Sequence, residues 1–179
     1  MHSMDGKITI LIVCIDDIIL IKNDEAEIGQ LKTLLSKEFE IKGMGPLQYF
    51  LEIEIAWSSR GILVSQRKYT LDLIQKIRML GCKLGDIPME PNHKLRLLRN
   101  SKVDRERYQL LVGILIYLSH TRPDTAFAVS VLCQFIHPPH EEHMEAICKI
   151  LKHLKSTLGK SLLLKKSEHL KVEAYTDSD

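Results

Sequence analysis

Apolar residues run almost without interruption from Ile8 to Ile21, where 11 of 14 positions are apolar and β-branched residues dominate. Because apolar and polar positions do not alternate there, the pattern predicts strands that are buried on both faces. Asp16 and Asp17 divide the stretch into two segments of hairpin length. We therefore predict a hairpin with this acidic pair at its tip.

Further along the chain, apolar positions repeat at intervals typical of helices and strands. Asp24 and Glu27 have the spacing of a capping box, and apolar residues follow at helical intervals up to Phe39. Strands are predicted over 47–57 and 61–65, and a helix over 66–80 has Ser65 as N-cap and Gly81 as C-cap. Three more helices are predicted over 104–119, from Pro123 to the Pro138-Pro139 pair, and over 140–157. Two strands over 161–165 and 171–175 complete the predicted elements. Together they indicate an α+β fold.

Composition and charge narrow the class of protein. With 45% apolar and 27% charged residues, the 179-residue chain is expected to fold as a globular protein. The net charge of +2 provides no overall attraction to nucleic acid or membrane, although residues 91–179 carry 14 basic and 10 acidic groups. Residues 82–101 lack periodicity and contain glycine and proline, so a domain boundary is expected there.

The four cysteines are far apart and include no C-x-x-C pair, which argues against a zinc ribbon or a disulfide scaffold. No secretory signal is recognisable, and the apolar stretch near the start is too short to span a bilayer. We expect an intracellular protein of a reducing compartment, cytoplasm or nucleus, that is not secreted and has no membrane partner.

Two acidic pairs could carry chemistry. Asp16 and Asp17 at a hairpin tip could bind a divalent cation, and they could equally be a favourable turn sequence. Asp177 and Asp179 follow a predicted strand and could bind a hard cation or belong to a solvated segment.

Basic and metal-ligating side chains gather in the second half. Seven lysines and one acid occur between Lys149 and Lys171, so Lys149, Lys152 and Lys155 could follow a phosphate backbone or form a solvated helix face. Histidines and cysteines between Cys133 and Cys148 do not have the spacing of a closed zinc site, and His143 is expected to pack or to cap a helix.

In order and spacing, these features resemble the reverse transcriptase of copia-type LTR retrotransposons, from about Ile8 to Asp179. The acidic pair Asp16-Asp17 matches the Tyr-x-Asp-Asp box of that family, with Cys14 at the usual aromatic position and Glu52 at a usual glycine. The other matching segments are 47–55, 65–69, Pro88-Met89, Tyr108–Leu118, Thr121-Arg-Pro-Asp124, His143-x-x-Ala146 and Tyr175-Thr-Asp177.

The resemblance implies an incomplete polymerase palm over 1–87, a helical thumb and connection over 88–158, and the first strands of an RNase H-like domain over 159–179. It also implies an RNA-directed DNA polymerase that copies an RNA or DNA template-primer, with Mg²⁺ (or Mn²⁺) held by three palm aspartates. Asp16 and Asp17 match two of these, the third would lie upstream, and Asp177 matches the first RNase H carboxylate. We therefore expect a truncated slice of a polyprotein that needs the rest of that polyprotein and is inactive alone.

Two other interpretations remain open. The chain could be a nucleic-acid-binding module without catalysis, because its second half is basic. It could also be an inert retrotransposon remnant that does not fold, because an Ile-rich hairpin without its partner strands would expose apolar surface and strand edges.

Overall fold

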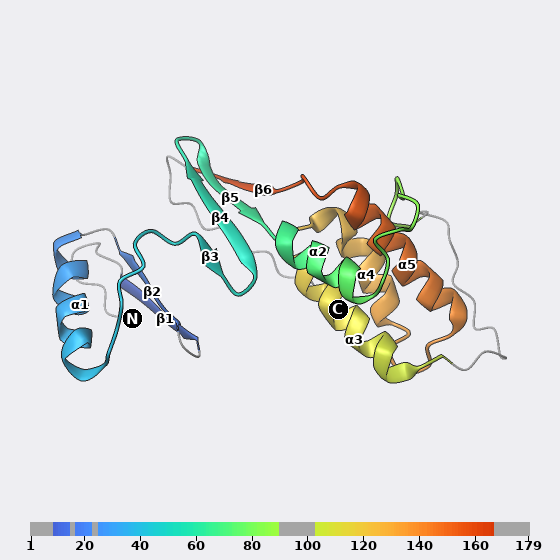
Figure 1. Cartoon of the computed structure of the whole chain (residues 1–179), viewed down its shortest axis with the longest axis horizontal. Coiled ribbons are helices and arrows are strands. Elements are labelled where there is room, and N and C mark those ends of the chain that lie inside the picture. Colours follow the sequence, from blue (N-terminus) through green and yellow to red (C-terminus); the bar gives the residue numbers. More distant parts are fainter. Residues whose placement is uncertain (1–8, 15–16, 23–24, 90–102, 167–179) are drawn as a thin grey trace, which may run out of the picture. The chain divides into compact units, whose positions relative to one another are not determined.

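The computed structural model of the chain describes residues 9–14, 17–22, 25–89 and 103–166. The chain divides into two compact units, Met1–Leu47 and Gln48–Asp179. Each unit contains helices and strands (Figure 1), which confirms the predicted α+β class.

The first unit is a hairpin followed by one helix. β1 (Thr9–Cys14) pairs antiparallel with β2 (Asp17–Lys22), and Cys14 lies opposite Asp17. Only residues 15–16 connect the strands, which is the commonest loop length of a β-hairpin. α1 (Glu25–Glu38) follows, so the predicted hairpin and helix are both confirmed. Asp24 of the predicted capping box lies outside the described residues.

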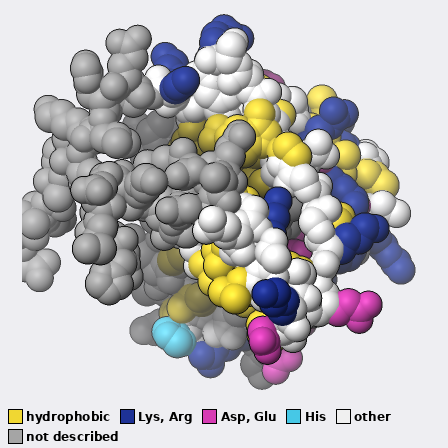
Figure 2. Space-filling model, turned by 90° about the vertical axis from the view of Figure 1, so that its left-hand side faces the viewer, with side chains coloured by type: hydrophobic (Ala, Val, Ile, Leu, Met, Phe, Trp, Pro, Cys, Tyr) yellow, Lys and Arg dark blue, Asp and Glu magenta, His cyan; other side chains and the backbone are white. Residues whose placement is uncertain are grey.

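The prediction that these strands are buried on both faces is wrong for the described residues. Six of their apolar side chains are 40–63% exposed: Ile10, Leu11, Ile12, Val13, Ile18 and Ile21. Among the described strands, β1 and β2 pair only with each other, and α1 contacts β2. A two-stranded sheet with one helix against it cannot cover both faces, so apolar side chains remain at the surface. Figure 2 shows one face of the molecule on which hydrophobic side chains are visible.

The second unit contains a four-stranded antiparallel sheet in the order β3 (Tyr49–Phe50), β4 (Ile53–Ser58), β5 (Gly61–Ser65) and β6 (Leu162–Lys165). The predicted single strand over 47–57 is wrong, because a two-residue turn separates β3 from β4. Both turn residues, Leu51 and Glu52, have positive φ values of 47° and 61°. This is the backbone conformation that a tight hairpin turn requires.

β6 joins this sheet from almost 100 residues further along the chain, with Leu162 opposite Val64 and Lys165 opposite Gly61. Gly61 has a φ of 144°, and a Cβ atom there would lie 2.1 Å from the carbonyl oxygen of Leu164. Glycine is therefore required at this position for β6 to approach β5.

The helices α2 (Arg67–Lys76), α3 (Arg105–Ser119), α4 (Ala126–Cys133) and α5 (Glu141–Ser156) lie together in Figure 1, with a 3₁₀ turn η1 (Pro123–Thr125) before α4. Their buried apolar side chains form one core: Leu73, Tyr108, Leu111, Val112, Leu115, Leu118, Ala128, Val129, Leu132, Ala146, Ile147, Ile150, Leu151 and Leu154. The predicted helices over 104–119 and 140–157 are confirmed, with Asp104 capping α3 by accepting from the Arg107 N–H at 3.1 Å.

Two other helices end earlier than predicted. Gln66 rather than Ser65 occupies the N-cap position of α2, although the Ser65 hydroxyl accepts from the Arg67 N–H at 3.3 Å. α2 ends at Lys76 rather than Leu80. Arg78 adopts a φ of 58°, and the Met79 N–H donates to the Ile74 carbonyl at 2.9 Å, which is a Schellman termination. α4 ends at Cys133, before the proline pair, because the N–H groups of residues 134–136 bond to carbonyls three residues back.

No helix within the described ranges is long and apolar enough to cross a membrane.

Candidate functional site

The acidic pair singled out in the sequence falls at the connection between β1 and β2. Asp17 is the first residue of β2, opposite Cys14, and is exposed. Exposure lets an ionised carboxylate keep its water or bind a cation without a burial penalty. Asp16 and Asp177 lie outside the described residues, as does the predicted strand over 171–175.

A metal centre needs several ligands within reach of one point. Within the described part of the chain, no group of three His, Cys, Asp or Glu side chains could hold a metal ion. Mg²⁺ prefers six oxygen ligands in octahedral geometry, several of them water. Asp17 alone among the described residues does not provide such a site, so no catalytic step through a metal follows from these residues.

His143 has the packing and capping role expected for it. Its side chain is fully buried, its Nδ1 atom accepts a hydrogen bond from the His140 backbone N–H at 2.9 Å, and its ring stacks on Phe135 with centroids 4.0 Å apart. Burial lowers the pKa of His143 below the ordinary histidine value, because the charged imidazolium loses its water.

The three lysines predicted to contact nucleic acid lie on α5 in different environments. Lys149 is exposed, whereas Lys152 and Lys155 are half-buried. The ammonium group of Lys155 donates to the carbonyl oxygens of Leu80 and, at 2.8 Å, Cys82. Lys155 therefore ties α5 to the segment after α2, and Lys149 is the member most open to a ligand.

Arg122 and Asp124 form an ion pair that sequence reasoning did not identify as a site. Arg122 is buried, and its Nε and Nη2 atoms donate to the two carboxylate oxygens of Asp124 at 2.9 and 2.8 Å. Arg122 also donates to the hydroxyl of Thr157 at 2.5 Å and to its carbonyl at 3.3 Å. The Thr121-Arg-Pro-Asp124 motif therefore fixes the start of α4 against the end of α5.

The same carboxylate has two further partners. The Nε2 atom of buried His153 lies 3.1 Å from Asp124, and the Lys160 ammonium lies 3.5 Å from it. The hydrogen bonds from Arg122 hold the pKa of Asp124 well below its usual range, against the opposing effect of partial burial. These two partners are 29 and 36 residues away in the sequence. The sequence therefore shows the motif but not the contacts that the motif makes.

The β3–β4 turn is held by two tyrosine hydroxyl groups, one from α3 and one from β3. The Tyr117 hydroxyl donates to the carbonyl of Leu51, and the Tyr49 hydroxyl donates to the carboxylate of Glu52. This bond to Glu52 is the main reason that the pKa of Tyr49 is raised to about 12. Tyr49 is nearly half exposed, with the Lys68 ammonium 5.8 Å from its ring centroid, so an aromatic and a cationic group share this surface.

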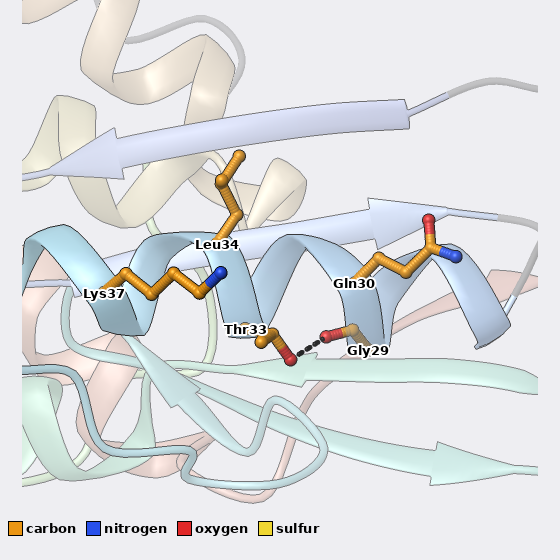
Figure 3. A pocket seen from close by; sticks show the side chains of 5 residues that line it. All are labelled: Gly29, Gln30, Thr33, Leu34 and Lys37. Carbon is orange, nitrogen blue, oxygen red and sulfur yellow. Dashed lines mark hydrogen bonds between the residues drawn. The ribbon is translucent and has the colours of Figure 1, made fainter.

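An open concave surface lies along α1 (Figure 3) and is lined by Gly29, Gln30, Thr33, Leu34 and Lys37. The hydroxyl of Thr33 donates to the Gly29 carbonyl at 2.9 Å, as the dashed line in Figure 3 marks. Its lining contains one cation and no carboxylate, histidine or cysteine. It therefore lacks metal-ligating side chains, and Lys37 is the one titratable side chain in its lining.

Comparison with known proteins finds a matching family model and several similar sequences. A family model described as "Reverse transcriptase (RNA-dependent DNA polymerase)" matches residues 2–91. The chain is 40% identical to the retrovirus-related Pol polyprotein from transposon RE1 of Arabidopsis thaliana over 97% of its length, and 32% identical to that from transposon TNT 1-94 of Nicotiana tabacum over 98%. It is also 34% identical to an uncharacterized mitochondrial protein of Arabidopsis thaliana, covering 94% of this chain and 70% of that protein. No solved structure matches the chain.

The Pol polyproteins are much longer than this chain. The matched region spans 12% of the RE1 polyprotein and 14% of the TNT 1-94 polyprotein.

Proposed function

Since the chain belongs to the reverse transcriptase (RNA-dependent DNA polymerase) family of copia-type retrotransposons, we propose that Asp16 and Asp17 are two of the palm carboxylates of an RNA-directed DNA polymerase. The observation that carries this proposal is the hairpin register, in which β1 ends at Cys14 and β2 begins at Asp17. This register puts the exposed Asp17 at the start of β2, directly after the two residues that connect the apolar strands. In the intact enzyme, Mg²⁺ or Mn²⁺ bound there would stabilise the charge that develops during nucleotidyl transfer.

Paramagnetic broadening of backbone NMR signals by Mn²⁺ tests this assignment without requiring catalysis. We expect signals around the hairpin tip to broaden first, and Asp16→Asn or Asp17→Asn to abolish the effect. Asp72→Asn is the matched control, because Asp72 is an exposed aspartate on α2. Equal broadening beside all exposed acidic residues would show non-specific binding and contradict the assignment.

We also propose that these 179 residues do not polymerise DNA alone. Two adjacent carboxylates cannot position both metal ions and the reacting oxygens, for which the family uses a third aspartate. Primer extension on an RNA template should therefore yield no product with the isolated chain. Template-dependent product that disappears in Asp16→Asn would overturn this expectation.

The partners that we propose are the template-primer and the rest of the Pol polyprotein. Within the chain we propose palm residues over 1–87, thumb and connection residues over 88–158, and the start of an RNase H-like domain over 159–179, with Asp177 as its first carboxylate. The confinement of α3, α4 and α5 to the second range supports its helical character. The β5–β6 pairing links the first and third ranges in one sheet.

A nucleic-acid-binding role for α5 is favoured by the exposure of Lys149. Lys149→Gln should weaken binding to an RNA–DNA duplex and lower the slope of log affinity against log salt by about 1, without changing stability. Lys155→Gln should instead lower stability, because its ammonium donates to the carbonyls of Leu80 and Cys82. No detectable duplex binding at low salt would eliminate this role.

A further inference from the structure

A small pocket lies at the start of α2, outside the hairpin and the α5 lysines. Its lining comes from three separate segments and consists of Gln66, Arg67, Thr70, Arg122, Leu158 and Lys160. The cavity volume is about 10 Å³, which is roughly the space for one water-sized group. The pocket can therefore admit a single oxygen atom from a larger ligand.

Gln66 presents an unused donor to this pocket. Its side chain is 4% exposed, and its Oε1 atom accepts a hydrogen bond from the Thr121 hydroxyl at 2.7 Å. Its Nε2 atom is shielded from solvent and has no hydrogen-bond partner among the described residues. Because buried amide groups are normally hydrogen-bonded, this atom indicates a missing acceptor in the pocket.

The charge of the lining specifies the kind of acceptor. Arg67, Arg122 and Lys160 are cationic, and the lining includes no acidic residue. The bonds of Arg122 to Asp124 and Thr157 leave one Nη1 hydrogen for another acceptor. Lys160 is 57% exposed and only 3.5 Å from Asp124, so its long side chain can turn toward the pocket. The Asp124 carboxylate compensates part of the charge of Arg122 and Lys160, and Arg67 adds a further cation. The surroundings of the unused Gln66 donor therefore remain net positive, which favours an anionic oxygen over neutral water.

The helix itself adds to this preference. Gln66 is the N-cap residue of α2, and its side chain makes no capping hydrogen bond, although the Ser65 hydroxyl accepts from the Arg67 N–H at 3.3 Å. The first N–H groups of a helix and its dipole attract negative charge. The backbone and the side chains around the pocket therefore favour the same ligand.

We propose that this pocket binds one non-bridging oxygen of a phosphate group, with the rest of the phosphate at the pocket mouth beside Arg67 and Lys160. The phosphate belongs to a nucleic-acid backbone, an assignment that rests on the proposed function. The pocket would then position the duplex through its backbone without reading sequence.

The first experiment follows the side-chain amide signals of Gln66 by ¹H–¹⁵N NMR during titration with inorganic phosphate, using chloride at equal ionic strength as the reference. We expect phosphate to shift these signals and Lys160→Gln to weaken the response several-fold. Lys76→Gln is the matched control, since Lys76 is an exposed lysine at the other end of α2. Signals that respond to neither salt would mean that the pocket holds only water, which overturns the proposal.

The second experiment measures the affinity of the chain for a short RNA–DNA duplex over a range of salt concentrations. Lys160→Gln and Arg67→Gln should each lower the log–log salt slope by about 1 relative to Lys76→Gln. Equal duplex binding by Lys160→Gln, Arg67→Gln and Lys76→Gln would overturn the proposal that this pocket binds a phosphate of the duplex. It would leave the proposed function intact. If phosphate shifts the Gln66 signals but the chain binds no duplex, the ligand of the pocket is free phosphate and not a nucleic-acid backbone. The same result would also eliminate the proposed nucleic-acid-binding role of α5. Thermal melts of the variants should match the unmodified chain, because both substituted side chains are exposed.

Discussion

Replacing Asp124 with asparagine should destabilise the second unit more than removing the charge of an exposed side chain does. The substitution keeps the shape of the side chain but removes the charge that pairs with Arg122, whose side chain is only 7% exposed, and with His153. Hydrogen bonds to charged groups contribute about 1.5–3 kcal/mol, and breaking a fully buried ion pair costs about 3–5 kcal/mol. Because Asp124 is itself 30% exposed and the asparagine amide would retain part of the bonding, we expect a loss of about 2–3 kcal/mol.

Urea unfolding followed by circular dichroism measures this loss as a lower midpoint with an unchanged slope. Asp72→Asn provides the matched control and should change stability by less than about 0.5 kcal/mol, because Asp72 is exposed. A loss in Asp124→Asn no larger than that of the control would refute the structural role of this ion pair.

The pH dependence offers an independent check. The pKa of Asp124 is lowered in the folded state, so its contribution is complete above the ordinary aspartate pKa of 3.8 and is lost as the pH falls below that value. The difference between the unmodified chain and Asp124→Asn should therefore be constant near neutral pH and shrink in acid. A difference that persists unchanged in strong acid would show that shape, and not charge, stabilises this site.

Three further predictions concern the same unit. Leu154→Ala should lower the free energy of unfolding by about 2–5 kcal/mol, because this side chain is fully buried. Leu110→Ala, at a side chain that is 64% exposed, should lower it by less than about 0.5 kcal/mol. Equal losses in urea unfolding would contradict the assigned core. Arg78→Gly should stabilise by about 0.5–1 kcal/mol because it relieves a positive φ, whereas Lys76→Gly should destabilise by a similar amount. Since the pKa of His143 is lowered in the folded state, the unfolded state binds more protons, and stability should fall as the pH drops below about 6.5. His143→Phe should flatten this pH dependence of stability. A pH profile that the substitution leaves unchanged would argue against a neutral buried imidazole.

The elements that the sequence predicted well are those determined by local patterns. The hairpin at Asp16-Asp17 follows from two apolar runs and a polar pair, and α5 follows from glutamates in its first turn and basic residues in its last turn. These signals lie within a few residues of the element that they specify.

The errors arise where distant residues or backbone geometry decide the structure. The break at Leu51 and Glu52 and the termination of α2, which uses Arg78 two residues after its end, rely on positive φ at residues other than glycine, so no turn residue marks them. The exposure of β1 and β2 depends on which strands pair with them, and apolar content does not reveal this. The Arg122–Asp124 site depends on His153 and Thr157, which only the packing of α5 brings near.

The pairing of β5 with β6 has a consequence for synthesis on the ribosome. Val64 is translated 98 residues before its partner Leu162. At a translation rate of roughly 5–20 residues per second, β5 waits roughly 5–20 s for the strand that covers its second edge. Throughout that interval the newly made sheet can pair with other nascent polypeptides instead.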